Sequence, residues 1–137
     1  VKYPYGLLTT PKSLEKTIKI LSKSYLLGIV TSRVKESIYK IPSLLKLKKY
    51  FQATVGYQDT INHKPHPEPF LLVSQKLNIN PSRAVYVGDV ESDMIAGKAA
   101  GMKTLLYSKT PLKNADLYTS VFTKLPKLIT KLGSSNF

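Results

Sequence analysis

Apolar residues recur at two different spacings along this chain, and the alternation between the spacings predicts helices and strands in turn. In residues 10–24, leucine and isoleucine recur at helical spacing beneath a lysine-rich face, which predicts an amphipathic helix. Residues 25–30 form a continuous apolar run that is too short for a helix and ends in β-branched side chains. Such a run is typical of a strand buried on both faces.

The same patterns continue to the end of the sequence. Further helices are predicted over residues 35–50 with a break at Pro42, and over 70–77, 92–100 and 125–132, and further strands over 53–57, 84–87, 104–107 and 118–122. Gly101 follows one of these helices in the position expected of a C-terminal cap. Strands that alternate with helices at this spacing imply βαβ units. We therefore expect one α/β domain over residues 1–137, with a mostly parallel sheet covered on both faces and a frayed tail at 133–137.

Charge is the compositional feature that narrows the partners most. Lys and Arg number 21 against 8 Asp and Glu, and the resulting net charge of +13 attracts nucleic acid, anionic surfaces or phosphorylated small molecules. The lysines at positions 12, 16, 19 and 23 stand at helical spacing and are not packed with aromatic residues into a stripe. That arrangement is typical of a solvated basic face, and an acidic companion chain would balance it equally well.

The chain has no cysteine, which excludes disulfides, thiolate metal sites and a cysteine nucleophile, and is compatible with a reducing cytoplasm. The longest apolar run, in residues 25–30, is far too short to span a bilayer, and residues 1–6 have no signal-peptide core. We therefore expect a soluble cytoplasmic protein without a membrane partner.

Polar residues directly after the predicted strands are the candidates for chemistry, because open parallel sheets bind ligands beyond the carboxyl ends of their strands. Thr31, Ser32 and Arg33 follow the apolar run in this way. Their hydroxyls and free backbone N–H groups suit the oxygens of an anion. The same residues also suit an ordinary turn with a hydroxyl cap.

Lys64 lies in the proline-rich segment from His63 to Pro69. Alternating prolines stiffen the backbone, and a fixed ammonium can screen phosphate charge and hold a nearby carboxylate ionised. A stiff surface loop with an incidental lysine is the alternative. His63 and His66 do not indicate a metal site, because no third ligand lies close in sequence.

Asp89 and Asp93 stand at a strand-to-helix junction, directly after Gly88. Carboxylates four residues apart at such a junction place hard oxygen donors where magnesium and a phosphate could share a site. Both residues could instead cap the following helix. Capping does not account for the predicted buried strand and the glycine that come immediately before Asp89.

In this order and spacing, the three segments resemble motifs II, III and IV of the haloacid dehalogenase-like (HAD) hydrolase superfamily, in its phosphoglycolate-phosphatase-like branch. The matching segments are Leu27–Thr31, Lys64–Pro67, and Gly88–Asp93 with the following Ala100–Met102. The resemblance covers residues 4–122 and implies a Rossmann-like three-layer sandwich. It also implies a magnesium-dependent phosphatase that acts on a phosphorylated small molecule.

The resemblance assigns a role to each candidate residue. Thr31 and the amide of Ser32 would bind the phosphoryl oxygens, and Lys64 would neutralise those oxygens and the nucleophile. Asp89 would ligate Mg²⁺ directly. Asp93 would help to hold the metal site together without binding the metal itself. The catalytic residues present in the chain are therefore Lys64 and Asp89.

The nucleophile of the family is an aspartate in an Asp-x-Asp motif at the end of the first, central strand. No Asp-x-Asp occurs in this chain, and the only carboxylate before Thr31 is Glu15. The resemblance thus implies a fragment or split subunit that lacks the nucleophile, the central strand and the substrate-selecting cap. Whether the chain alone is an enzyme stays open.

Three arrangements are open at the position of the missing strand: a companion polypeptide supplies strand and nucleophile, the flanking strands close up, or a second copy of the chain fills the space. A non-catalytic phosphate- or nucleic-acid-binding module is the alternative function. Dehalogenase activity is a weaker hypothesis. The Gly-Asp-x-x-x-Asp motif at residues 88–93 indicates a magnesium site, and displacement at a carbon–halogen bond does not need magnesium. The phosphate ester itself is not identified without the cap.

Overall fold

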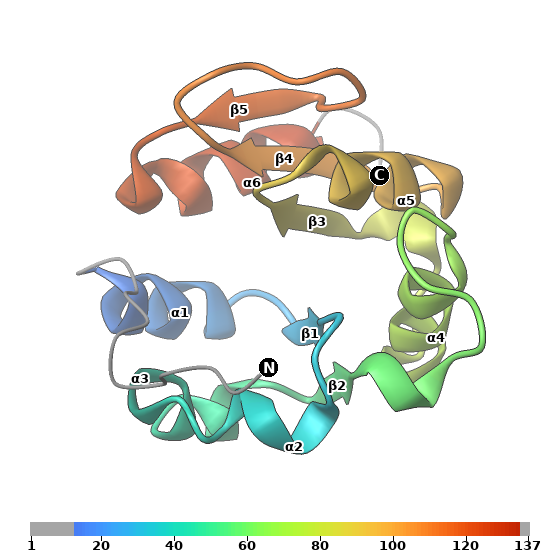
Figure 1. Ribbon diagram of the computed structural model, residues 1–137. Coiled ribbons are helices and arrows are strands. Elements are labelled where there is room, and N and C mark those ends of the chain that lie inside the picture. The colour runs from blue at the N-terminus through green and yellow to red at the C-terminus, as the bar shows by residue number, and fades with distance from the viewer. Residues whose placement is uncertain (1–12, 135–137) are drawn as a thin grey trace.

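The computed structural model describes residues 13–134 and shows helices packed around two parallel β-sheets (Figure 1). The first sheet contains β1 (Gly28–Val30) and β2 (Ala53–Val55), and the second contains β3 (Val85–Gly88), β4 (Lys103–Tyr107) and β5 (Leu117–Thr119) in that order. The helices are α1 (Leu14–Ser22), α2 (Lys35–Ile38), α3 (Pro42–Leu45), α4 (Glu68–Leu77), α5 (Glu91–Ala99) and α6 (Leu125–Ser134). Short 3₁₀ turns are η2 (Lys48–Tyr50), η3 (Tyr57–Asp59), η4 (Pro81–Arg83) and η5 (Phe122–Lys124). The predicted α/β class with parallel strands is confirmed.

Helix ends follow the local signals in the sequence. Asn78 ends α4 with a φ of 56°, and Gly101, with a φ of 91°, follows α5 as predicted. Pro42 is the first residue of α3, so the predicted break in 35–50 lies just before it. Helix α6 extends to Ser134, two residues beyond the predicted end. Residues 10–12 of the first predicted helix and 135–137 of the predicted tail lie outside the described residues.

The prediction of a strand buried on both faces over residues 25–30 is wrong in extent and in burial. Only Gly28 to Val30 pair as a strand, whereas Tyr25 donates its backbone N–H to the Leu21 carbonyl oxygen at 2.9 Å and continues the end of α1. Leu26 is 55% exposed, and no residue of β1 or β3 is fully buried. Each of these two strands has one edge that pairs with no other strand in the described residues, which leaves its residues partly exposed.

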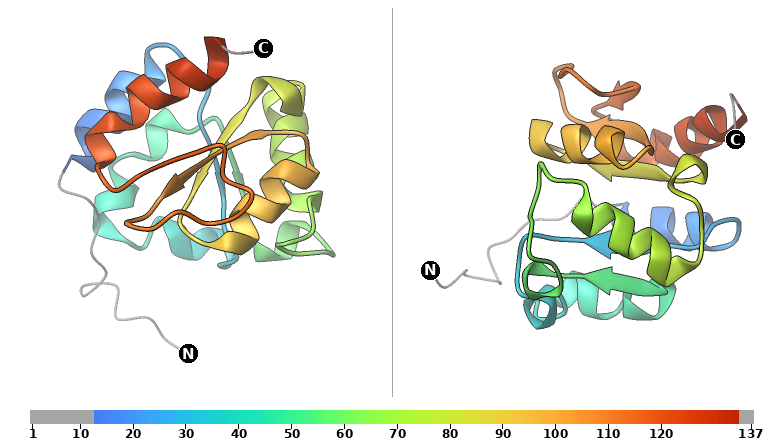
Figure 2. Two further views of the ribbon diagram at one scale, coloured as in Figure 1. Left: turned by 90° about the horizontal axis from the view of Figure 1, so that it is seen from above. Right: turned by 90° about the vertical axis from the view of Figure 1, so that its right-hand side faces the viewer.

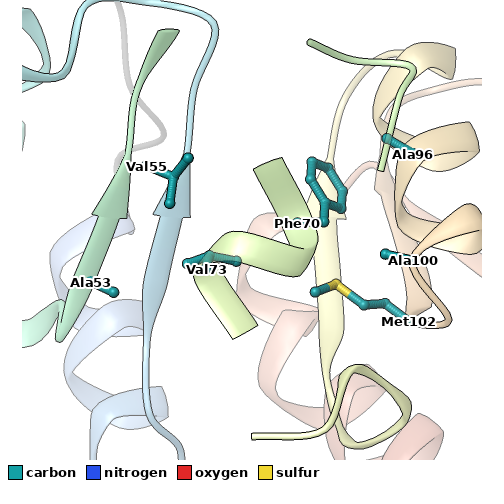
Figure 3. Packing of buried hydrophobic residues seen from close by; sticks show 7 residues of the cluster. All are labelled: Ala53, Val55, Phe70, Val73, Ala96, Ala100 and Met102. Atoms are coloured by element: carbon teal, nitrogen blue, oxygen red, sulfur yellow. The ribbon is translucent and has the colours of Figure 1, made fainter. Parts of the chain in front are cut away.

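Helices α4 and α5 cover one face of both sheets. Their apolar side chains join those of the strands in one buried cluster of Ala53, Val55, Phe70, Val73, Ala96, Ala100 and Met102. Figure 3 shows Val73 on α4 directed toward β1 and β2, while Phe70, one turn away, is directed toward the other sheet. Phe70 is fully buried, and its ring packs on that of Tyr86 in β3 with centroids 4.2 Å apart. Helix α4 therefore bridges the two sheets.

Helices α1 and α6 cover the opposite face. Leu21 of α1 packs with Leu105 of β4 and with three buried residues of α6, Leu125, Ile129 and Leu132. Figure 2 shows the two helices side by side, and the hydroxyls of Tyr25 and Thr130 lie 3.1 Å apart between the end of α1 and α6. A helix layer thus spans the sheets on each face, as expected for a three-layer sandwich.

A slot separates the two sheets. In the described part of the chain β1 pairs with β2 alone, and the inner edge of β3 pairs with no strand. The facing edges border an open cavity of about 730 Å³. Its lining includes Leu21, Gly28, Val30, Val73, Leu77, Val85, Tyr86, Val87 and Ile129. Of the three arrangements considered above, direct closure of the flanking strands is therefore not the one adopted.

Replacement of Phe70 by Ala is expected to destabilise the fold by about 3–5 kcal/mol, because it removes a fully buried ring that ties α4 to β3. Urea unfolding followed by circular dichroism measures the change. Leu71→Ala is the matched control, since the Leu71 side chain is 46% exposed and its loss should cost no more than about 0.5 kcal/mol. Equal losses in the two variants would contradict the bridging role of Phe70.

Candidate functional site

The carboxyl ends of β1, β2 and β3 bring three of the candidate segments to one edge of the molecule. Thr31 follows β1, and its backbone N–H donates to the Val55 carbonyl oxygen at 2.9 Å. Its hydroxyl accepts the backbone N–H of Arg33 at 3.1 Å, so the predicted turn with a hydroxyl cap is present. Ser32 is exposed at this turn. The turn leaves Thr31 and Ser32 where an anion could reach them from the carboxyl edge.

Residues 57–67 leave the end of β2 and run along this edge to α4 (Figure 2). Two carboxylates hold this loop in place. Asp59 accepts the backbone N–H of Gly56 at 2.8 Å, and Glu68 accepts those of Ile61 and Asn62, each at 3.0 Å. The sequence pattern does not single out Asp59 or Glu68. They were missed because their acceptor function depends on a turn that local patterns do not specify.

Lys64 and Asp93 are brought into direct contact. The Lys64 ammonium donates to Asp93 Oδ1 at 2.8 Å, and their side chains are only 14% and 5% exposed. Water and salt screen a pair at this depth much less than a surface pair. The sequence predicted separate roles for the two residues, whereas the structure makes Asp93 the group that fixes the Lys64 ammonium.

Asp93 gathers further donors. The Tyr86 hydroxyl lies 3.5 Å from Oδ1 and the Asp89 backbone N–H 3.4 Å from Oδ2, both long contacts. Burial, together with the neighbouring carboxylates of Asp93 and Asp89, raises the pKa of Tyr86 far above its ordinary value. Tyr86 therefore stays protonated and can act only as a donor toward Asp93. Sequence reasoning placed Tyr86 in a strand but missed this contact.

Gly88 is required by the approach of Asp93. A Cβ atom on Gly88 would lie 2.7 Å from Cβ and from Oδ2 of Asp93, closer than such atoms can come. The N-cap of α5 is Val90, without a side-chain cap bond, so the alternative in which Asp89 or Asp93 serves as that N-cap is wrong. The glycine before Asp89 instead allows the buried carboxylate to lie against the strand end.

The donor set suits a hard cation only in part. Mg²⁺ commonly takes one or two carboxylates and keeps several waters. Asp89 is exposed at the strand end and Asp93 is buried next to it. In residues 13–134, no three His, Cys, Asp or Glu side chains gather as a metal cluster. His63 stacks on Tyr57 with ring centroids 4.0 Å apart, and His66 accepts the backbone N–H of Glu68 at 3.0 Å.

The chain is similar to hydrolases of known family. A family model described as haloacid dehalogenase-like hydrolase matches residues 7–107. The pyrophosphatase PpaX of Bacillus pumilus is 38% identical over 99 residues, which cover 72% of this chain and 46% of that protein. The phosphoglycolate phosphatase of Escherichia coli K12 is 39% identical over 80 residues, which cover 58% of this chain and 32% of that protein. The chain thus spans about half or less of these two relatives.

Solved structures agree with these relatives. A HAD-superfamily hydrolase of subfamily IA from Geobacter sulfurreducens superposes with a TM-score of 0.79 at 28% identity, covering 90% of this chain and 63% of that one. A HAD-superfamily hydrolase from Ehrlichia chaffeensis gives a TM-score of 0.75 at 25% identity, covering 88% of this chain and 58% of that one.

Replacement of Asp93 by Asn is expected to lower the free energy of unfolding by about 3 kcal/mol, because the Lys64 ammonium then lacks its buried counter-charge. Urea unfolding of the full chain measures the loss. Asp89→Asn is the control, since Asp89 is exposed and its side chain should contribute within about 0.5 kcal/mol. A loss at position 93 no larger than at 89 would show that the ion pair does not hold the site.

The loop before Lys64 is expected to loosen in acid. Backbone N–H donors from Asn62 and then Ile61 lower the pKa of Glu68, so its stabilisation is present above the ordinary carboxyl pKa and is lost as pH falls through the lowered one. Amide hydrogen exchange of Ile61 and Asn62, corrected for intrinsic rates, should therefore accelerate in that window. Glu68→Gln should abolish the pH dependence and Glu91→Gln should preserve it. A profile unchanged by Glu68→Gln would rule out this carboxylate as the cause.

Proposed function

This chain belongs to the haloacid dehalogenase-like hydrolase family, and from that membership we propose that it carries the phosphate- and magnesium-binding part of a phosphate-monoester phosphatase. The observation that carries the proposal is the Lys64–Asp93 ion pair, held at 2.8 Å beside Asp89 at the carboxyl edge of β3. A fixed, poorly screened ammonium next to an exposed carboxylate fits a site that binds a phosphate dianion together with a cation.

Each residue contributes a separate function to phosphate binding. The Thr31 hydroxyl and the Ser32 backbone N–H donate to the phosphoryl oxygens. Lys64 neutralises the negative charge of these oxygens, and Asp93 holds the Lys64 ammonium in the site. Asp89 would hold Mg²⁺ directly, and Asp93 would help to position Asp89 without binding the metal itself. When bound, the cation would offset negative charge on the phosphoryl oxygens and orient the group for attack.

We also propose that a β-strand from outside these 137 residues occupies the slot and carries the attacking carboxylate. The slot offers two facing, unpaired strand edges and a largely apolar lining, and a parallel strand there would pair on both sides. Its carboxyl end would lie between Thr31 and Asp89. A carboxylate oxygen there can bond to phosphorus as the ester oxygen leaves, and water then hydrolyses the aspartyl-phosphate.

The source of this strand follows from the sequence. A second copy of the chain contains no Asp-x-Asp, so it could fill the slot but could not supply the nucleophile by that motif. A companion polypeptide, or another segment of a longer protein, satisfies both needs. We further propose a cytoplasmic location, which suits a chain without cysteine. Within the described residues no helix is long and apolar enough to cross a membrane.

The test uses the protein isolated from its native cells together with whatever copurifies, with intact masses recorded. The complex should release phosphate from 2-phosphoglycolate, a phosphate monoester that the name of one relative suggests as a first substrate, and release should require Mg²⁺. Asp89→Asn should lower the rate by at least about 100-fold. Glu91→Gln, an exposed carboxylate two residues away, is the control and should retain it.

Two results would overturn the proposal. Asp89-dependent phosphate release by the 137-residue chain alone, at verified mass, would mean that the nucleophile lies within it. Undiminished turnover by the Asp89→Asn complex would mean that the carboxyl edge of β3 is not the site of reaction.

A further inference from the structure

The acidic residues of this chain are concentrated at the carboxyl edge described above. Of the 8 acidic residues, Asp59, Glu68, Asp89, Glu91 and Asp93 lie in the loop after β2, at the start of α4, or at the junction of β3 with α5. The strong positive surplus of the chain therefore lies on other surfaces.

Helix α1 carries one row of this surplus. Lys16, Lys19 and Lys23 are exposed and follow one another at spacings of three and four residues, so they form a ridge along the helix. The buried residues Thr17 and Leu21 lie on the opposite side, against the core. The ridge therefore faces solvent.

Helix α6 carries a second row with the same geometry. Lys124, Lys127 and Lys131 are exposed at spacings of three and four residues, starting in the turn that leads into the helix. The opposite side of the helix holds the buried residues Leu125, Ile129 and Leu132. This ridge too faces away from the sheets.

The two ridges belong to one surface. Helices α1 and α6 lie side by side, joined by the 3.1 Å contact between Tyr25 and Thr130 and by a shared apolar cluster (Figure 2). The only acidic residue on either helix is Glu15, whose carboxylate lies 3.5 Å from Lys19 and 3.4 Å from Lys46. Lysines thus outnumber acidic side chains on this surface by six to one.

We propose that the outer surface of α1 and α6 binds the sugar–phosphate backbone of nucleic acid. Packed helices lie about 8–10 Å apart, so two parallel lysine rows can contact successive phosphates of a strand. Lysine is a flexible point charge without the planar fork that reads base edges, so the binding is independent of sequence. A membrane surface fits less well, because Leu21 of α1 and the apolar face of α6 are already buried in the core.

The test measures binding of the full chain to a fluorescent 20-base-pair DNA duplex by anisotropy over a series of salt concentrations. The triple variant Lys16→Gln, Lys23→Gln, Lys127→Gln removes three ridge lysines and spares Lys19, which pairs with Glu15. The slope of log affinity against log salt should become shallower by about 0.9 per lost phosphate contact, or about 2.7 in all.

The matched control removes the same charge elsewhere, with Lys40→Gln, Lys76→Gln and Lys113→Gln, all exposed and on other elements. This variant should keep the slope of the parent chain. If both triple variants lost DNA affinity equally, net charge alone would explain the binding, and the proposal that the α1 and α6 surface binds DNA would be wrong. Absence of binding at low salt, or tighter binding to phosphatidylserine vesicles than to the duplex, would overturn it as well.

Discussion

The unpaired edges of β1 and β3 are the constraint on which the rest of this structure depends. Backbone N–H and C=O groups along a strand need partners, and within residues 13–134 each of these two strands pairs with another strand only on its outer side. The sheet is consequently divided, and the helices keep its parts together: α4 and α5 on one face, α1 and α6 on the other.

The same division runs through the candidate site. Thr31 belongs to the sheet of β1, whereas Asp89 and Asp93 belong to that of β3. The loop of residues 57–67 crosses between them, fixed by Asp59 and Glu68 at its start and end, and carries the Lys64 ammonium to Asp93. One ion pair therefore connects this loop to the junction of β3 with α5, beside the proposed metal ligand Asp89, and a strand in the slot would complete the proposed site from its centre.

Charge is partitioned by the fold. Carboxylates gather at the edge where a cation and a phosphate would meet, while lysines line the outer side of the α1 and α6 layer. A long anionic polymer on that layer and a small phosphate ester at the carboxyl edge would occupy different surfaces. The proposal for the carboxyl edge rests on membership of the haloacid dehalogenase-like hydrolase family, whereas the proposal for the helix layer rests on the exposed lysines of α1 and α6.

The sequence by itself determined the α/β class, most element positions, the helix end at Gly101 and the segments that reach the carboxyl edge, because those features depend on spacing within a few residues. It also established that no Asp-x-Asp is present. Only the tertiary structure decided that Lys64 meets Asp93, that Glu68 braces the loop, that β1 and β3 stay apart and that two lysine rows share a surface. These features join residues far apart in the chain, and their geometry follows from how the helix layers pack, which no local pattern specifies.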